Sequence, residues 1–210
     1  MSDEPQPDIV HLNLPLSPEE ARSLSLGDMV LLDGEVTVSA GMITQERIIE
    51  ALESGEDLPF DLQGQAFFHM GSNCREENGK WLPNYVNPTT STRFDALMPT
   101  IIRGLGLTSV GGKGGMGPQC VEAMQEIGCV YFSMPGGASP LLTNGVVERL
   151  ETGWDDLIEQ FRLARYQLKS FGPVTVAIDA HGNSMFQKLQ QEAADKLPGI
   201  LQELAAARQK

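Results

Sequence analysis

Residues 107–128 read LTSVGGKGGMGPQCVEAMQEIG, and they indicate the fold class of the chain most directly. Residues 107–110 have the composition of a short strand, and a glycine-rich loop around Lys113 follows them. Pro118 then occupies a favoured first position of a helix. The apolar face and the glycine stop of that predicted helix are given by Val121, Met124, Ile127 and Gly128. The order of strand, glycine loop and helix predicts an α/β layered domain.

A second strand-to-helix transition precedes this one at residues 87–93, which read NPTTSTR. An apolar stripe at helical spacing follows it, at Phe94, Leu97, Met98, Ile101, Ile102 and Leu105. The stripe predicts a helix over residues 94–105. Pro99 predicts a kink in this helix, because proline removes one backbone donor.

Strands and helices are mixed along the rest of the chain. The patterns predict strands at residues 29–32, 34–41, 65–69, 130–133 and 174–179, and a polar excursion at residues 71–80. They predict a helix that begins at Ser17, helices over residues 44–55 and 154–168, and a C-terminal helix over residues 186–208 that is interrupted at Pro198-Gly199. We expect a main domain over residues 11–186, a flexible arm at residues 1–10 and a helical extension at residues 187–210.

The composition of the 210 residues is that of an ordinary folded protein, with 41% hydrophobic and 20% charged residues. The chain has 15 Lys and Arg against 28 Asp and Glu, a formal net charge of −13. An acidic excess of this size repels phosphate backbones, and the Lys and Arg residues are scattered rather than gathered in a basic patch. We therefore expect no nucleic-acid partner.

The three cysteines, Cys74, Cys120 and Cys129, form no CxxC pair. Their number and spacing argue against a disulfide framework and against a zinc or iron–sulfur site held by this chain alone. The first residues, MSDEPQPD, lack the basic flank and apolar stretch of a secretory signal, and no apolar run reaches membrane-spanning length. We expect a cytoplasmic protein with reduced thiols, no membrane association and no metal ligands.

Residues 112–117 read GKGGMG and match the GxGxxG fingerprint of dinucleotide-binding loops. The acidic residue that such sites carry about 20 positions later is absent, and Lys113 is followed by glycine rather than by the Ser or Thr of a phosphate-binding Walker loop. Nicotinamide binding and a purely structural glycine turn remain alternatives. We favour a lysine held for an anion, because the amides at a helix start attract negative charge.

Hydroxyl residues precede a single arginine in the earlier transition, at Thr89 to Thr92 and Arg93. A hydroxyl run of this kind often serves only as a helix cap. With Arg93 beside it, however, the turn has the groups to clamp a planar carboxylate. Twenty residues separate Arg93 from Lys113, about one helix and one strand, so both cations can meet at the same edge of a sheet.

The remaining candidate residues have structural interpretations. Asp179 and His181 flank a strand-end turn, which we favour over a metal pair or an acid–base dyad. His11 and His69 are isolated in the sequence and receive no functional weight. Cys120 and Cys129 bracket the predicted helix after Pro118 and are expected to be small buried residues rather than nucleophiles.

Four motifs carry a resemblance to a known family: PFDLQG at residues 59–64, PTTSTR at residues 88–93, GKGGMGP at residues 112–118, and FGP at residues 171–173 leading to IDAHGN at residues 178–183. The chain resembles the beta subunit, or C-terminal domain, of class I iron–sulfur hydro-lyases, namely fumarate hydratase and L(+)-tartrate dehydratase. The resemblance covers about residues 24–186. It implies a swivelling β/β/α three-layer domain, with a [4Fe–4S] cluster held by three cysteines of a separate alpha subunit or N-terminal domain.

The resemblance also implies the roles of individual residues. Thr89 is similar to the family's proposed catalytic base, and Arg93 and Lys113 are similar to its dicarboxylate ligands. Thr90, Ser91 and Thr92 would contribute hydroxyls or amides to the same turn. The implied reaction is reversible removal of water from a hydroxy-dicarboxylic acid of the malate or tartrate type, in a hetero-oligomer with the alpha subunit or a homodimer of the domain.

One stretch departs from the family pattern. Members usually carry an Arg-Asp pair and then a His after the first long strand, whereas residues 37–44 here read TVSAGMIT. The substrate-contacting arginine is thus replaced near Ala40. Either Arg47 or Arg75 substitutes for it, or the substrate differs, or the chain is a non-catalytic paralogue that binds a carboxylate.

Overall fold

The computed structural model describes residues 9–208 of the chain. Its elements follow in the order β1 (Ile9–Leu14), α1 (Pro18–Ser23), β2 (Met29–Val38), α2 (Met42–Ser54), β3 (Ala66–Phe68), β4 (Met70–Glu77), β5 (Lys80–Pro88), η1 (Ser91–Phe94), α3 (Met98–Leu105), β6 (Ser109–Gly112), α4 (Pro118–Ile127), β7 (Val130–Ser133), α5 (Ser139–Thr143), β8 (Val146–Gly153), η2 (Glu159–Phe161), β9 (Leu163–Ile178) and α6 (Met185–Ala207), where η marks a 3₁₀ helix. The mixed α/β class predicted from the sequence is confirmed.

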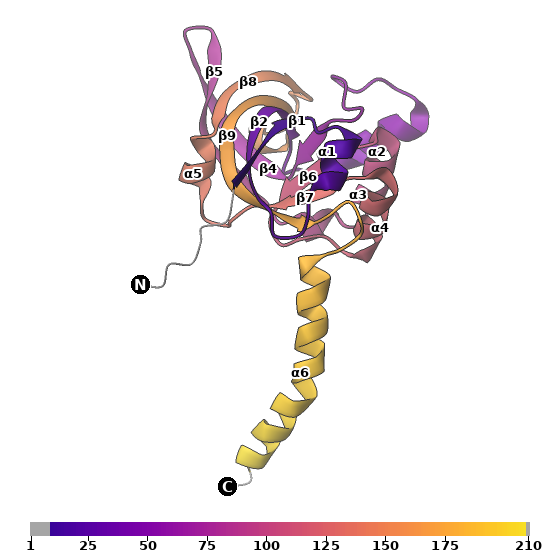
Figure 1. Ribbon diagram of the computed structural model, residues 1–210. Coiled ribbons are helices and arrows are strands. Elements are labelled where there is room, and N and C mark those ends of the chain that lie inside the picture. Colours follow the sequence, from indigo (N-terminus) through magenta and orange to yellow (C-terminus); the bar gives the residue numbers. More distant parts are fainter. Residues whose placement is uncertain (1–8, 209–210) are drawn as a thin grey trace.

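One sheet holds the strands in the order β1-β2-β3-β6-β7-β9-β8-β5-β4. Strands β1, β2, β3, β6 and β7 run parallel, and β9 pairs antiparallel with both β7 and β2. The sheet therefore closes on itself through β2 and β9, and Figure 1 shows the long β9 curling around β2. Because β2, β3, β6 and β7 are parallel, their carboxyl ends meet at one edge.

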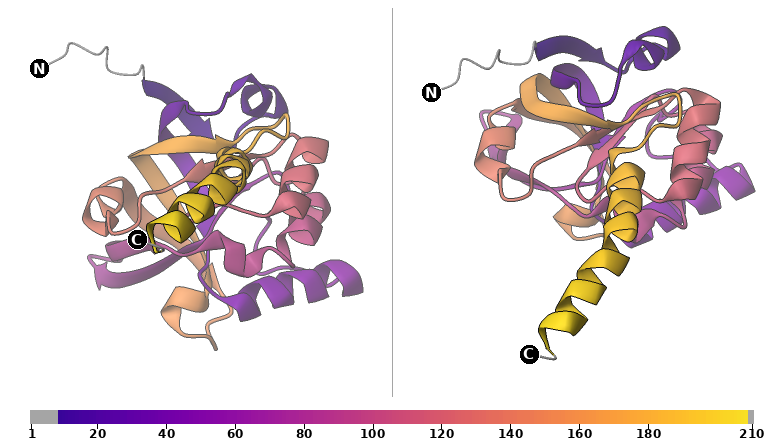
Figure 2. Two further views of the ribbon diagram at one scale, coloured as in Figure 1. Left: turned by 90° about the horizontal axis from the view of Figure 1, so that it is seen from below. Right: turned by 60° about the horizontal axis from the view of Figure 1, so that its bottom comes forward.

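Apolar cores lie on both faces of these parallel strands. Neighbouring strand residues point to opposite faces, so Phe68 packs inside the curled sheet while Phe67 packs under the helices. Phe132 and Tyr131 of β7 divide in the same way, and all four side chains are fully buried. The helix-side core joins residues of α2, α3 and α4, which lie together on one face in Figure 2. Burial on both faces explains the continuous apolar sequence of the strands.

The helix boundaries agree with the predicted stop signals. Both α2 and α4 end at glycines in the left-handed region, Gly55 with φ 74° and Gly128 with φ 87°. The predicted kink at Pro99 is wrong. A 3₁₀ turn forms first, and α3 begins only at Met98, so Pro99 lies in the first turn, where its missing N–H is not needed.

Two further predictions from the sequence are corrected. Residues 71–80 are not a loop but most of a hairpin of β4 and β5, joined at Asn78 and Gly79, which both have positive φ as a tight hairpin turn requires. Residues 154–168 do not form a helix. Only η2 lies there before β9, in which Leu163, Tyr166 and Leu168 are buried as parts of a strand that pairs on both sides.

The chain ends differ in how far the structure describes them. Of the predicted arm at residues 1–10, residues 1–8 lie outside the described residues, and Ile9 and Val10 begin β1. The predicted interruption of the C-terminal helix is wrong, since α6 continues through Pro198 and projects from the rest of the domain in Figure 1. No helix within residues 9–208 is long and apolar enough to cross a membrane.

Candidate active site

The two strand-to-helix transitions lie side by side at the carboxyl edge of the parallel strands. Thr90 and Lys113 form a parallel bridge directly after β5 and β6. The amide of Ser91 donates to the carbonyl of Lys113 at 2.8 Å, and the amide of Lys113 donates to the carbonyl of Thr89 at 3.1 Å. Backbone hydrogen bonds therefore fix the hydroxyl turn and the glycine loop to each other.

Thr89 and Arg93 form the charged part of the turn. Arg93 Nη2, within the 3₁₀ turn Ser91–Phe94, donates a hydrogen bond to Thr89 Oγ1 at 2.6 Å, four residues earlier in the chain. The guanidinium carbon lies 5.4 Å from the centroid of the Phe94 ring, while the side chain remains exposed. A cation next to a hydroxyl favours the form of that hydroxyl that has lost its proton. Arg93 can thus bind an anion, and Thr89 Oγ1 can accept or donate a proton.

Glycines shape the loop that carries the half-buried Lys113. A Cβ added to Gly112 would lie 2.3 Å from Ser91 Oγ, so the turn approaches the loop too closely for any larger residue there. Gly114 and Gly115 both have positive φ, 82° and 74°, which residues with side chains rarely adopt. The loop leads into the N-terminus of α4, whose dipole also favours negative charge. These features support the anion-binding interpretation of Lys113.

His69, which is isolated in the sequence and received no functional weight there, lies beneath the turn. It follows β3, is fully buried, and packs its ring 4.6 Å from that of Phe94. Its Nδ1 lies 2.9 Å from Ser91 Oγ, and Ser91 Oγ lies 2.9 Å from the hydroxyl of Tyr131. Burial, and then the positive charge of Arg93, lowers the pKa of His69 to about 3. The imidazole is therefore neutral at physiological pH, and its Nε2 has no hydrogen-bond partner.

The other predicted residues of the turn differ in accessibility. Ser91 is fully buried, and both its amide and its hydroxyl are engaged within the protein. Thr90 is half-buried, and Thr92 is exposed. Thr92 also lines a hollow of about 280 Å³, together with Gly114 and the first turns of α6. Access to a ligand therefore decreases from Thr92 to Thr90 to Ser91.

The two arginines considered as substitutes near Ala40 are held by other groups. Arg47 makes two hydrogen bonds to Asp156, at 2.9 and 2.6 Å. Arg75 donates to Glu77 at 3.2 Å and to Asn84 at 3.0 Å. The partners of both guanidinium groups lie outside the turn that carries Thr89. The site as described therefore rests on Arg93 and Lys113.

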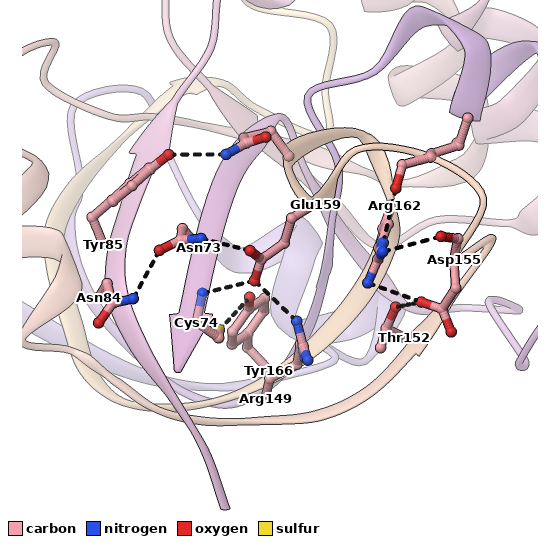
Figure 3. Close-up of polar contacts among 12 residues, drawn as sticks. Asn73, Cys74, Asn84, Tyr85, Arg149, Thr152, Asp155, Glu159, Arg162 and Tyr166 are labelled. Carbon is pink, nitrogen blue, oxygen red and sulfur yellow. Dashed lines mark hydrogen bonds and ion pairs between the residues drawn. The ribbon is translucent and has the colours of Figure 1, made fainter. Parts of the chain in front are cut away.

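The segment around Ala40, where the family's arginine is absent, is hydrogen-bonded to η2. The amide of Ala40 donates to the carbonyl of Gln160 at 3.0 Å, and the hydroxyls of Ser39 and Thr44 both donate to the carbonyl of Phe161. In Figure 3, Glu159 anchors η2 in turn. Its carboxylate accepts hydrogen bonds from the Asn73 side chain at 2.6 Å, the Cys74 amide at 2.7 Å and the Arg149 guanidinium at 3.2 Å.

Residues with structural interpretations behave as predicted. Asp179 accepts hydrogen bonds from the amides of His181 and Asn183, and His181 Nε2 donates to the carbonyl of Arg22, so this is a strand-end turn. All three cysteines are buried. Burial raises the thiol pKa of each of them, to about 12 in the case of Cys120. Within residues 9–208, no three His, Cys, Asp or Glu side chains gather as a metal site.

The neutral, buried imidazole of His69 predicts that stability decreases with acid. Its pKa is about 3 in the folded chain but about 6.5 in an unfolded one. The unfolded chain therefore binds the proton more readily, and stability falls as pH drops from 6.5 toward 3. Between pH 8 and pH 5 the loss is about 2 kcal/mol. In urea unfolding at both pH values, His69→Gln should lose about 2 kcal/mol less than the wild type.

The control for this measurement is His11→Gln, which changes an exposed histidine on β1. It is expected to keep the pH dependence of the wild type. Equal losses for the wild type and His69→Gln would show that His69 does not resist protonation in the folded state.

Known proteins resemble this chain along most of its length. A family model described as Fumarase C-terminus matches residues 2–189. "L(+)-tartrate dehydratase subunit beta" of Escherichia coli K12 is 32% identical over 193 residues, which cover 92% of this chain and 94% of that protein. "Putative L(+)-tartrate dehydratase subunit beta" of Methanocaldococcus jannaschii is 32% identical over 188 residues, 89% of this chain and 95% of that one. "Putative fumarate hydratase class I" of Geobacillus stearothermophilus is 31% identical over 195 residues, 90% of this chain but 36% of the longer relative.

Proposed function

The chain belongs to the Fumarase C-terminus family, and from this membership we propose that it is the beta subunit of a hydro-lyase. The proposed reaction is reversible removal of water from a hydroxy-dicarboxylic acid of the malate or tartrate type. The observation that carries the proposal is the junction of Thr89, Arg93 and Lys113, where backbone bonds join two motifs 20 residues apart. The curled sheet with cores on both faces fits the swivelling β/β/α domain implied by the resemblance.

In this proposal the two cations divide the work of holding a dicarboxylate. Arg93 presents a planar fork to one carboxylate, and Lys113 supplies a point charge with the amides of its loop. Thr90 and Thr92, the more accessible residues of the turn, contribute polar contacts to the substrate. Ser91, whose hydroxyl is bonded to His69 and Tyr131, positions the turn rather than contacting substrate.

Thr89 Oγ1, in the deprotonated form that the neighbouring Arg93 charge favours, takes the proton from the carbon next to the carboxylate and becomes a neutral hydroxyl, while the hydroxyl on the neighbouring carbon leaves. Loss of that proton builds enolate-like charge on the carboxylate, and fixed cations stabilise such charge without having to reorganise. The 2.6 Å hydrogen bond from Arg93 to Thr89 places the acceptor of the proton and the stabilising cation on one turn. Binding and proton transfer are therefore linked through Arg93.

A [4Fe–4S] cluster held by a partner alpha subunit completes the proposed enzyme. The thiols of this chain do not fit cluster ligation, because all three are buried in separate places and their raised pKa values favour the protonated form. When bound by the partner, the cluster supplies a Lewis-acidic iron for the departing hydroxyl. The exposed position of Arg93 leaves the site open to such a partner.

A substrate panel on the co-purified alpha–beta complex tests the proposal. We expect dehydration of malate, tartrate or a methylated analogue, and a much slower reaction with a monocarboxylic hydroxy acid of the same length. The reason is that Arg93 and Lys113 would each bind one carboxylate, and a monocarboxylic acid leaves one of these cations without a ligand. Equal rates with monocarboxylic acids would contradict the assignment of Arg93 and Lys113.

The second candidate is a carboxylate-binding paralogue without hydro-lyase activity. It is favoured by one observation, that residues Ser39 to Thr44 lack an arginine and are tied to η2 by side-chain and backbone bonds. Calorimetric binding of a dicarboxylate to a complex that carries a full cluster, with no turnover, would support this candidate over the first.

A further inference from the structure

Helix α6 leaves the domain with its apolar face uncovered. Met185 and Phe186, at its start, pack against the helix-side core, but every residue from Lys188 to Arg208 is exposed. Figures 1 and 2 show the helix projecting away from the sheet. Its large aliphatic residues are each more than half exposed: Leu189, Leu197, Ile200, Leu201 and Leu204. Such a helix draws its stability from packing of its apolar face, so it needs a partner.

The apolar residues of α6 repeat at heptad spacing. Apolar residues seven positions apart form two sets, Ala193, Ile200 and Ala207 in one and Leu197 and Leu204 in the other, and the polar Gln190 precedes the second set. The two sets alternate at spacings of three and four residues, as the d and a positions of a coiled coil do. Pro198 and Gly199 then fall at b and c, which face away from a partner helix. The residues that weaken the helix therefore do not interrupt the seam.

Most of α6 lies outside the part of the chain that the family shares. Its partner is therefore not expected to be a surface that all family members carry. The family model ends at residue 189, so nearly all of the projecting part lies beyond the common domain. A helix with one heptad seam is complementary to an identical helix, and two copies related by a twofold axis bury the same residues. We propose that α6 pairs with α6 of a second copy of this chain in an antiparallel coiled coil.

Charge and geometry both support the antiparallel orientation. Lys196 and Glu203 occupy g positions beside the seam, and in an antiparallel pair Lys196 lies opposite Glu203 of the second copy, twice by symmetry. Leu197 then faces Ile200 of the second copy. In a parallel pair Lys196 faces Leu201 instead. The 23 residues of α6 span about 35 Å, so antiparallel pairing also keeps the two domains at opposite ends.

Sedimentation velocity of the full chain tests the proposal. The wild type is expected to be a dimer at micromolar concentrations. L197E/L204E places charges in the seam and should raise the dissociation constant at least about 100-fold. The matched control Q202E/A205E adds the same two charges at positions f and b, and should remain a dimer. Circular dichroism and thermal unfolding should show the domain intact in both variants, because these residues make no contact with it.

A charge exchange tests the orientation. K196E places two glutamates opposite each other in the antiparallel pair and should weaken the dimer, and K196E/E203K should restore it. A monomeric wild type, or a dimer that survives L197E/L204E, would overturn the proposal. So would a chain that is monomeric alone and uses α6 only to bind a cluster-bearing subunit.

Discussion

Arg93→Ala is expected to lower kcat of the assembled enzyme about 10²- to 10³-fold, the effect of removing one fixed group that stabilises transition-state charge. The loss exceeds a simple weakening of binding, because Arg93 also donates the 2.6 Å hydrogen bond to Thr89 Oγ1. Steady-state kinetics of the alpha–beta complex, with malate or tartrate as substrate, measure it. Arg93→Lys keeps the charge but not the fork, and should recover only part of the activity.

The control for Arg93 is Arg103→Ala on α3. Arg103 is also an exposed arginine in a short helical segment, but it forms a surface ion pair with Glu126. Surface pairs of this kind contribute little, so activity should remain near that of the wild type. An Arg93→Ala enzyme with unchanged kcat would contradict the role assigned to the turn. A raised KM with unchanged kcat would limit Arg93 to binding alone.

Thr89→Val is expected to reduce kcat about 10²- to 10⁴-fold, the range that a positioned general base contributes. Valine has nearly the shape of threonine but has no oxygen to receive a proton or to accept the bond from Arg93. The direct measurement is exchange of the substrate's carbon-bound proton with deuterated water in the assembled complex. This exchange should disappear in Thr89→Val and return in part in Thr89→Ser, which keeps the hydroxyl.

The same measurement separates the base from a merely structural residue. If Thr89→Val exchanged the proton at the wild-type rate but dehydrated slowly, another group would be the base. The second measurement is the affinity for a dicarboxylate inhibitor, determined by calorimetry. This affinity should fall only modestly in Thr89→Val, because Arg93 and Lys113 both remain.

The parts of the site that follow local signals could be predicted from the sequence. The order of strand, glycine loop and helix depends on neighbours within a few positions. The helix begins at Pro118 and ends before Gly128 as expected, whereas β6 covers Ser109–Gly112, two residues later than the predicted strand. The spacing of one helix and one strand also predicted that the hydroxyl turn and the glycine loop meet, and their backbones do pair at Thr90 and Lys113. Asn78-Gly79 is a hairpin signal that the polar composition of residues 71–80 concealed.

The remaining parts depend on contacts that no local pattern carries. His69, Ser91 and Tyr131 meet across separations of 22 and 40 residues, so the pattern of residues around His69 does not indicate its buried partners. The failure at residues 163–168 has a similar cause. Pairing of β9 with β2 and β8 buries alternate residues there, and this pairing overrides a local helical preference. Pro198 also failed as a helix stop, since it lies on an exposed face of α6 where a lost backbone bond can be solvated.

In the proposed enzyme, this chain supplies a dicarboxylate half-site that a cluster-bearing alpha subunit completes. The most direct test is anaerobic co-expression of the two chains, followed by an assay of dehydration by each chain alone and by the purified complex. We expect turnover by the complex, none by this chain alone, and loss of turnover when Arg93→Ala replaces the wild type. No turnover of any hydroxy-dicarboxylic acid by a complex that carries a full cluster would contradict it.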